Sequence, residues 1–379
     1  MVSKRTKILV LTTAVAAICF FWLEKSFLTG VSDKFPPNKN FEILNSVIRH
    51  IKNDYIDEAD PRKTMEGAFR GLAGSLDVLS SYLDGPAAAK CADPQKLSFK
   101  DAGIILFKRS GGFPVVVGLV ENSSAEKAGI KIGDYVSALD DRSTLIQGLQ
   151  EIIFYLKDSE NKSVKLRLIR DNSTQEIKID RADLYPKPLT FTALKGTSGI
   201  VKIHHFYPSL TADFVKSLLP KLKQEQRPII LDLRNCFEGD VAEAQKFLNV
   251  FIKADKIGYF EKKGAVKEYL GCPDNAELEK SSLIIWANQA TMGPAEIVAA
   301  VLKDFKKARI VGIQTPGLTA RQDLYKLENG DALLLTTGIF FLNSGEKLWE
   351  KGVAPDVKLE FNEQDQKSYE EKTLGLISR

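Results

Sequence analysis

The segment from Asn288 to Gln322 constrains the fold of this chain more than any other. It follows a short apolar run, Leu283 to Trp286, that predicts a buried strand. Gly293 and Pro294 then predict a tight turn, because proline favours the first position of a helix. Apolar residues recur at helical spacing from Ile297 to Phe305, and another apolar run follows. We therefore expect a strand, turn, helix and strand, with backbone N–H groups of the helix start facing a cleft that could hold an oxyanion.

The same segment resembles the serine peptidases called carboxy-terminal processing, or tail-specific, proteases. In that family the strand, turn, helix and strand carry S-A-S-A-S-E-I, then an acidic residue, then T-F-G-K-G-x-x-Q. The positions that this chain keeps in register with the pattern are Glu296, Ile297, Asp304, Val311, Gly312, Thr315, Gly317 and Gln322.

The two positions that perform the family's chemistry differ in this chain. The resemblance places the nucleophilic serine at Gly293 and the general-base lysine at Leu318. Glycine has no side chain and leucine cannot accept a proton, so the resemblance implies a peptidase framework without its catalytic dyad. Thr291 is the nearest hydroxyl that could act as a displaced nucleophile, but we expect it to point elsewhere on the turn.

The turn that helps to form the family's oxyanion hole is also altered. Residues 232–239 resemble the family pattern D-L-R-x-N-P-G-G, with Cys236, Phe237 and Glu238 in place of N-P-G and with Gly239 retained. Glu238 is expected to set a carboxylate where developing negative charge must be stabilised. That charge has the wrong sign for acyl transfer.

Residues 121–141 resemble the PDZ signature g-S-P-A-x-x-A-G-L-x-x-G-D-x-I-x-x-I-d-G. A PDZ domain binds an extended C-terminal tail by strand addition, and backbone amides of a glycine loop hold the carboxylate. That loop usually reads x-G-L-G-I. Asp101 replaces one of its glycines, and it either weakens tail binding or points to water. The predicted peptide-binding residues are Asp101, Ala102, Gly103, Ile104 and Leu145, near which the helix beside the pocket is expected to begin.

The resemblance extends from about Phe41 to Leu359, and it predicts an α+β multidomain chain. A helical segment typical of the family's dimer contacts precedes a β-barrel-like PDZ domain and an α/β peptidase core of the crotonase or Clp kind. The predicted boundaries are a signal anchor over 1–30, a linker and helical region over 31–96, the PDZ domain over 97–181, the core over 182–361 and a frayed, charged tail over 362–379.

The N-terminus predicts a place outside the cytoplasm. Three basic residues precede an apolar run of 16 residues from Ile8 to Leu23. As a helix this run spans about 24 Å, slightly short of the usual membrane span of about 20 residues. We expect an uncleaved membrane anchor with a cytoplasmic N-terminus, and the remainder on the periplasmic or cell-surface side. A cleaved signal peptide is the alternative, but the apolar residues after Ala14-Val15-Ala16 argue against cleavage there.

Charge and cysteine content exclude several function classes. The net charge of +4 and the lack of a basic stripe argue against nucleic acid as a partner. We expect no metal and no cofactor, because three histidines and four cysteines show no zinc-type spacing. Beyond the anchor, Cys91, Cys236 and Cys272 can hold one disulfide or remain free thiols.

Three functions are compatible with this pattern. The first is an inactive homologue of the peptidases that binds peptide or protein C-terminal tails, or pairs as a homodimer or with an active paralogue, and so regulates or scaffolds envelope proteolysis. The second is an active serine-type endopeptidase with unorthodox catalytic residues. The third is a purely structural scaffold of the cell envelope. Fold alone does not separate them, because function depends on the site.

Overall fold

A computed structural model describes residues 37–92, 100–157, 161–184, 187–360 and 365–378. The chain divides into two compact units, residues 1–65 and 66–379. In the first, helix α2 (Pro37–Asp54) exposes apolar side chains, among them Phe41 and Ile43. Helix α3 (Pro61–Gly74) begins there and continues into the second unit. No helix within the described ranges is long and apolar enough to span a bilayer, and the predicted anchor over 1–30 lies outside those ranges.

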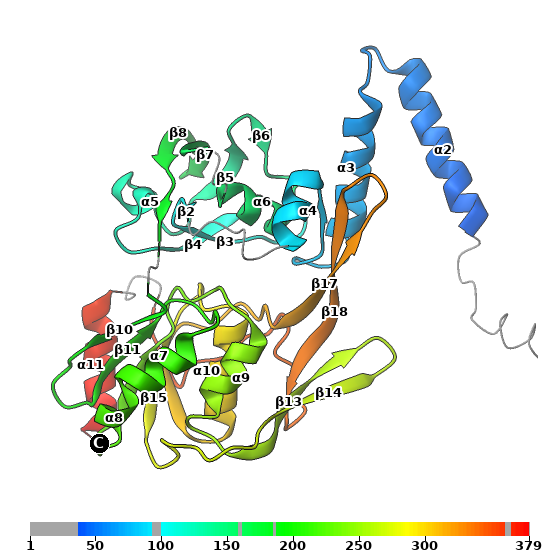
Figure 1. Cartoon of the computed structure of the whole chain (residues 1–379). Helices are drawn as coiled ribbons and strands as arrows, with labels where there is room; N and C mark the ends of the chain where they lie inside the picture. The colour runs from blue at the N-terminus through cyan, green and yellow to red at the C-terminus, as the bar shows by residue number, and fades with distance from the viewer. Residues whose placement is uncertain (1–36, 93–99, 158–160, 185–186, 361–364, 379) are drawn as a thin grey trace, which may run out of the picture. The chain divides into compact units, whose positions relative to one another are not determined.

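The peptidase-like core is built on a six-stranded sheet in the order β10-β11-β12-β15-β16-β19 (Figure 1). Strand β10 pairs antiparallel with β11, and the other pairs are parallel. The strands are β10 (Leu189–Thr192), β11 (Gly199–Ile203), β12 (Ile229–Asp232), β15 (Leu283–Ala287), β16 (Ala308–Gly312) and β19 (Val357–Lys358). The α/β core predicted from the sequence is thereby confirmed.

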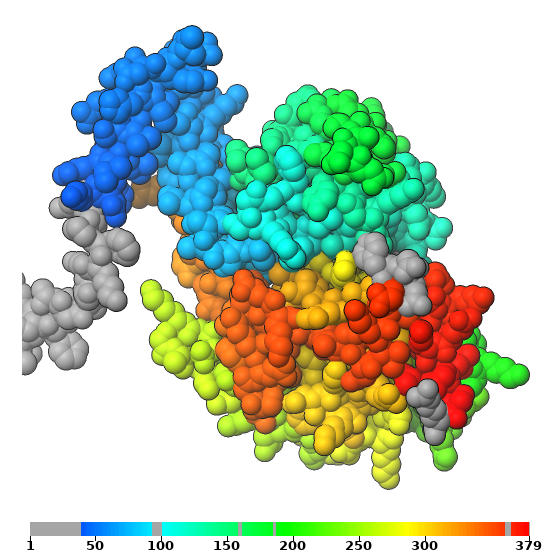
Figure 2. Space-filling model, turned by 180° about the vertical axis from the view of Figure 1, so that it is seen from behind, coloured from blue at the N-terminus to red at the C-terminus, as the bar shows by residue number. Residues whose placement is uncertain are grey.

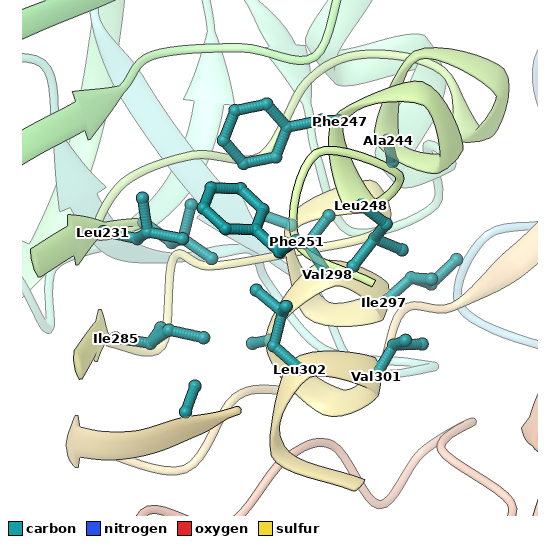
Figure 3. Packing of buried hydrophobic residues seen from close by; sticks show 14 of the residues in the cluster. Leu231, Ala244, Phe247, Leu248, Phe251, Ile285, Ile297, Val298, Val301 and Leu302 are labelled. Carbon is teal, nitrogen blue, oxygen red and sulfur yellow. The ribbon is translucent and has the colours of Figure 1, made fainter. Parts of the chain in front are cut away.

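Alternate side chains of the central strands enter two different apolar clusters. Leu231 and Ile285 pack beneath helices α9 (Val241–Leu248) and α10 (Pro294–Asp304), as Figure 3 shows. Ile230, Ile284 and Trp286 join the cluster on the other face of the sheet. This explains the continuous apolar run Leu283 to Trp286, because a strand covered on both faces needs apolar residues at every position. The helices α7 (Leu210–Ser217) and α8 (Leu219–Leu222) complete the first layer.

The C-terminal segment is a docked helix, and the predicted frayed tail is wrong over residues 366–377. Helix α11 (Gln366–Ile377) buries Tyr369 and Thr373. The Tyr369 hydroxyl donates to the Ala287 carbonyl at 2.9 Å, and Trp286 Nε1 donates to Thr373 Oγ1 at 2.8 Å. The sequence of this helix shows little amphipathic pattern, since few of its apolar residues are buried. The helix is therefore held on the core by these side-chain hydrogen bonds.

A second sheet extends from the core in the order β1-β18-β13-β14, with β17 paired to β18. Its strand β18 is long, and together with β17 it extends from the core towards α4 (Figure 1). The elements of this region are β1 (Ser81–Leu83), α4 (Gly85–Ala92), β13 (Ala254–Lys262), β14 (Val266–Cys272), β17 (Ala320–Lys326) and β18 (Ala332–Leu342).

The PDZ domain is a small barrel-like sheet in the order β3-β4-β5-β7-β8, with β6 on β5 and the separate pair β2-β9. Its side chains lie directly against those of the core in the rear view of Figure 2. Its elements are β2 (Lys100–Asp101), β3 (Ile104–Phe107), β4 (Val115–Leu119), α5 (Ser124–Lys127), β5 (Tyr135–Leu139), β6 (Arg142–Ser143), α6 (Leu149–Leu156), β7 (Ser163–Arg170), β8 (Ser173–Asp180) and β9 (Ala182–Asp183).

Candidate functional site

A cavity of about 440 Å³ lies between the PDZ domain and the core. The PDZ side contributes Leu106 of β3 together with Leu149 and Ile153 of α6. The core side brings together the positions that the sequence singled out, since Gly239, Gly293, Leu318 and Gln322 all line the cavity. The turn before α10 and the face of the PDZ domain formed by β3 and α6 therefore line the same cavity.

Gly293 begins helix α10 in a backbone conformation that favours glycine, with φ +57° and ψ −118°. A Cβ atom added there would have its nearest neighbour, the Leu318 carbonyl oxygen, at 3.8 Å. Room for a side chain thus exists at this position, although the positive φ strains any residue other than glycine.

The carboxylate of Glu296 holds this turn together. It accepts from Gly293 N at 3.0 Å, Leu318 N at 2.7 Å, Gly317 N at 2.6 Å and Thr315 Oγ1 at 2.5 Å. Burial raises the pKa of Glu296 to about 7, although these hydrogen bonds act in the opposite direction. Because its oxygens are taken up by the turn, Glu296 fixes the backbone of Gly293 beside that of Leu318 and does not face the cavity as a base.

Leu318 belongs to the apolar contact between the two domains. Its side chain is buried and joins the PDZ cluster together with Met292 and Ala290 from the turn before α10. The position that the resemblance assigns to the general base therefore contributes packing here.

Glu238 differs from its expected placement. Its carboxylate forms an ion pair with Lys157, which follows helix α6 of the PDZ domain, and accepts from the Tyr207 hydroxyl at 3.2 Å. The Phe237 ring lies 5.8 Å from the Lys157 ammonium. Glu238 is absent from the residues that line the cavity, so its charge acts at the contact between the domains. The sequence pointed to the wrong location because Lys157 is 81 residues away in the chain.

The backbone conformation and the close packing at position 239 require glycine. Its φ is +132°, and an added Cβ would come within 2.5 Å of the Phe206 backbone. Phe206 N donates to the Glu238 carbonyl at 2.8 Å, and Asp240 N donates to the Phe206 carbonyl at 2.9 Å. This turn is thus fixed to the end of strand β11.

The alternative nucleophile, Thr291, and the two histidines that follow β11 lie outside the cavity. Thr291 is fully buried, and its hydroxyl donates to the Leu233 carbonyl at 2.8 Å, so it points away from the cavity as expected. His204 and His205 do not line the cavity, and burial lowers the pKa of His204 to about 4. Among the described residues that do line it, the ionisable ones are Asp240, which caps α9, and Arg321, which pairs with Glu268.

One polar group at the cavity was not anticipated from the sequence. Thr319 is completely buried, and its hydroxyl has no hydrogen-bond partner within the described residues. It follows Leu318 directly and lines the cavity. A buried hydroxyl without a partner is costly, so a ligand that supplies one would relieve that cost.

The other retained positions support the framework. Gln322 lines the cavity, and its Nε2 donates to the Leu79 carbonyl at 2.9 Å. Asp304 lies at the far end of α10, where burial and Glu346 raise its pKa, and it does not reach the cavity.

The predicted carboxylate loop of the PDZ domain has its glycine in place. Gly103 has φ +82°, and an added Cβ would overlap Ser123 Cβ at 2.2 Å. Asp101 points into this loop, because its Oδ1 accepts from Gly103 N at 2.8 Å. Ala102 and Ile104 are buried within the PDZ cluster and do not line the cavity.

Leu145 is not a groove residue, and this part of the prediction is wrong. Helix α6 begins at Leu149, and Leu145 is 41% exposed in the preceding loop. The loop turns around the Lys108 ammonium, which donates to the carbonyls of Thr144, Leu145 and Gln147. Three carbonyls of the loop are therefore used to satisfy a buried lysine, and the helix face at the groove starts later.

The cysteines of the described ranges are separate from one another. The three cysteines in the described ranges, Cys91, Cys236 and Cys272, are free thiols, and burial raises the pKa of Cys272 to about 11. No group of three or more metal-ligating side chains occurs in the described part of the chain.

Comparison with known proteins places these features in a family. Residues 197–359 match peptidase family S41, and residues 115–170 match the PDZ domain. The chain is 27% identical over 358 residues to the carboxy-terminal processing protease CtpA of Bacillus subtilis (strain 168), covering 93% of this chain and 76% of that relative. It is 25% identical over 354 residues to a probable CtpA-like serine protease of Staphylococcus aureus (strain COL), covering 93% of this chain and 71% of that relative.

A solved structure supports the same fold. The photosystem II D1 C-terminal processing protease superposes with a TM-score of 0.70 at 20% identity, covering 87% of this chain and 90% of that one. This chain therefore contains a peptidase family S41 core and a PDZ domain, and over most of its length it is similar to carboxy-terminal processing proteases.

Proposed function

We propose that this chain is a catalytically inactive homologue of the carboxy-terminal processing peptidases that binds polypeptide between its PDZ domain and its core. One observation carries the proposal. Gly293 and Leu318, at the positions of the family's nucleophile and base, meet at the cavity, and neither has a side chain that can attack a carbonyl or accept a proton.

The chemistry around the cavity supports binding. Its walls carry apolar side chains from both domains, and Thr319 offers a hydroxyl that has no partner within the described residues. Ligand sites commonly combine apolar walls with a few polar groups. Strand addition at β3 uses backbone hydrogen bonds, so it does not depend on the lost dyad.

A partner role outside the cytoplasm extends the proposal. Phe41, Ile43 and Val47 expose apolar area on α2, in the region that the family uses for dimer contacts. We expect a homodimer or a pair with an active paralogue, anchored to the membrane by the N-terminal segment and regulating proteolysis in the cell envelope. Co-purification with the full chain, read by mass spectrometry, tests for a paralogue that carries the serine and lysine.

The direct test is hydrolysis of unstructured peptides with apolar tails by the full chain. We expect no cleavage, and none from Gly293→Ser alone, although the turn has room for the serine side chain. Activity should require Leu318→Lys as well, because the parts of a catalytic unit act together.

Three results would contradict the proposal. Cleavage that survives further purification and is lost with Thr319→Val or Thr291→Ala would establish a peptidase with unorthodox residues. Strong cleavage by Gly293→Ser alone would mean that another base is present. Failure of every peptide to bind would instead favour a purely structural scaffold.

A further inference from the structure

The PDZ groove shows which kind of polypeptide it accepts, provided that the cavity binds polypeptide as proposed above. Strand β3 is the last strand in its sheet order, so its second edge has no strand partner among the described elements. Leu106 of β3 faces Leu149 and Ile153 of α6 across the cavity. An extended segment with apolar side chains fits this groove by strand addition.

The end of the groove that would receive a terminal carboxylate is filled from within the chain. A PDZ domain holds the ligand carboxylate with N–H groups of its glycine loop. Here the Gly103 N–H already donates to the Asp101 carboxylate at 2.8 Å. Asp101 supplies the same acceptor that a peptide C-terminus would supply, and it is part of the loop itself.

The charged groups around Asp101 do not favour a further carboxylate. Burial raises the pKa of Asp101, Lys157 lowers it and Glu238 raises it, and Lys157 already pairs with Glu238. The Lys157 and Glu238 side chains are only 10% and 14% exposed, so water screens this pair weakly. A free C-terminus would become a third carboxylate around one ammonium group.

We propose that this groove selects an internal or otherwise neutral extended segment and disfavours a free C-terminal carboxylate. A bound segment should therefore pass the loop without ending in it. The ligand class is thus an internal apolar segment of a polypeptide, and not its C-terminal tail.

Two labelled peptides test this specificity with the full chain. Both have the sequence Ser-Ala-Val-Ser-Leu-Ala-Val, one with a C-terminal amide and the other with a free acid, and fluorescence anisotropy measures their affinities. We expect the amide to bind about tenfold more tightly, the order of a single charged contact. Asp101→Asn should reduce this ratio to about twofold or less while it keeps an acceptor for Gly103 N.

Two further variants make the result specific. Asp101→Gly frees the Gly103 N–H and removes the charge, so the acid should then bind at least as tightly as the amide. Asp141→Asn is the matched control, because Asp141 lies in the same domain, pairs with Lys165 and is 86% exposed. It should leave the ratio of affinities unchanged.

The outcomes separate this inference from the proposed function. Equal binding of the two peptides by the wild type, or tighter binding of the acid, would overturn the selectivity while polypeptide binding stands. An equal change of the ratio in Asp141→Asn would also overturn it, because the effect would then come from net charge alone. Absence of binding by both peptides would overturn the selectivity and the polypeptide-binding function together.

Discussion

The turn at α10 and the carboxylate loop of the PDZ domain have diverged in opposite ways. At the turn, the reactive positions are Gly293 and Leu318, while Glu296 still joins the two backbones by hydrogen bonds. In the loop, Gly103 keeps its conformation, and Asp101 adds a charge that the family pattern lacks. The first site carries glycine and leucine at the positions that the resemblance assigns to reactive side chains, and the second carries a carboxylate where the resemblance expects glycine; both have groups that determine the backbone.

This difference indicates which residues a fold requires and which only a function requires. A buried carboxylate that accepts four hydrogen bonds cannot be removed without leaving buried donors unpaired. A nucleophile or a base has no such structural role, so its loss leaves the fold intact. The predictions that follow test this distinction, beginning with the largest expected effect.

Glu296→Ala should destabilise the chain more than any other change at the two sites. It leaves three buried N–H groups and the Thr315 hydroxyl without their acceptor, and we expect a loss of about 3–5 kcal/mol in the free energy of unfolding. Urea denaturation measures it. Glu371→Ala, which removes a 66% exposed carboxylate on α11, should change the value by less than about 0.5 kcal/mol. A loss at Glu296 no larger than this control would show that the turn does not depend on the carboxylate.

The pH dependence of stability also tests the role of Glu296 in the turn. Burial raises the pKa of Glu296 to about 7 from the ordinary 4.5, so the folded chain holds this proton more tightly than the unfolded chain. The resulting stabilisation is complete below pH about 4.5 and is lost as the pH rises through about 7, by about 3 kcal/mol at most. Glu296→Gln should flatten that part of the curve. The same slope in wild type and variant would assign it to another group.

Lys157→Met breaks the ion pair between the PDZ domain and the core. The partner Glu238 is largely buried, so we expect a loss of about 2–3 kcal/mol in the free energy of unfolding. Lys223→Met is the matched control, since Lys223 pairs with Glu277 where both side chains are about half exposed, and it should cost at most about 1 kcal/mol. If Glu238→Gln suppresses the effect of Lys157→Met, the two residues interact directly. Additive losses would refute that interaction.

Thr319→Val gives the smallest expected effect and tests the cavity itself. The hydroxyl lacks a partner in the described structure, so its removal should not destabilise the fold. If it bonds to a bound peptide, the affinity should fall about fivefold, as the loss of about 1 kcal/mol predicts. Thr211→Val removes another buried hydroxyl without a partner, outside the cavity, and should leave binding unchanged. An unchanged affinity in Thr319→Val would exclude the hydroxyl from the ligand contact.

The sequence by itself determined the family, the PDZ and peptidase domains, and the turn that places Gly293 at the start of a helix. These follow from local patterns, because apolar spacing, a glycine at positive φ and a proline at a helix start act within a few residues. The residues at the positions that the resemblance assigns to the serine and the lysine, Gly293 and Leu318, are likewise visible in the sequence alone.

Only the tertiary structure decided which partners several side chains contact. Glu238 faces Lys157 and not the cavity, and Thr319 has no partner among the described residues. Helix α11 docks on Trp286, and Leu145 lies in a loop that turns around Lys108. Each of these depends on contacts between groups whose positions a local pattern does not encode. The physical reason is that a side chain's partner is determined by packing between distant segments, while its backbone conformation is determined largely by its neighbours in the chain.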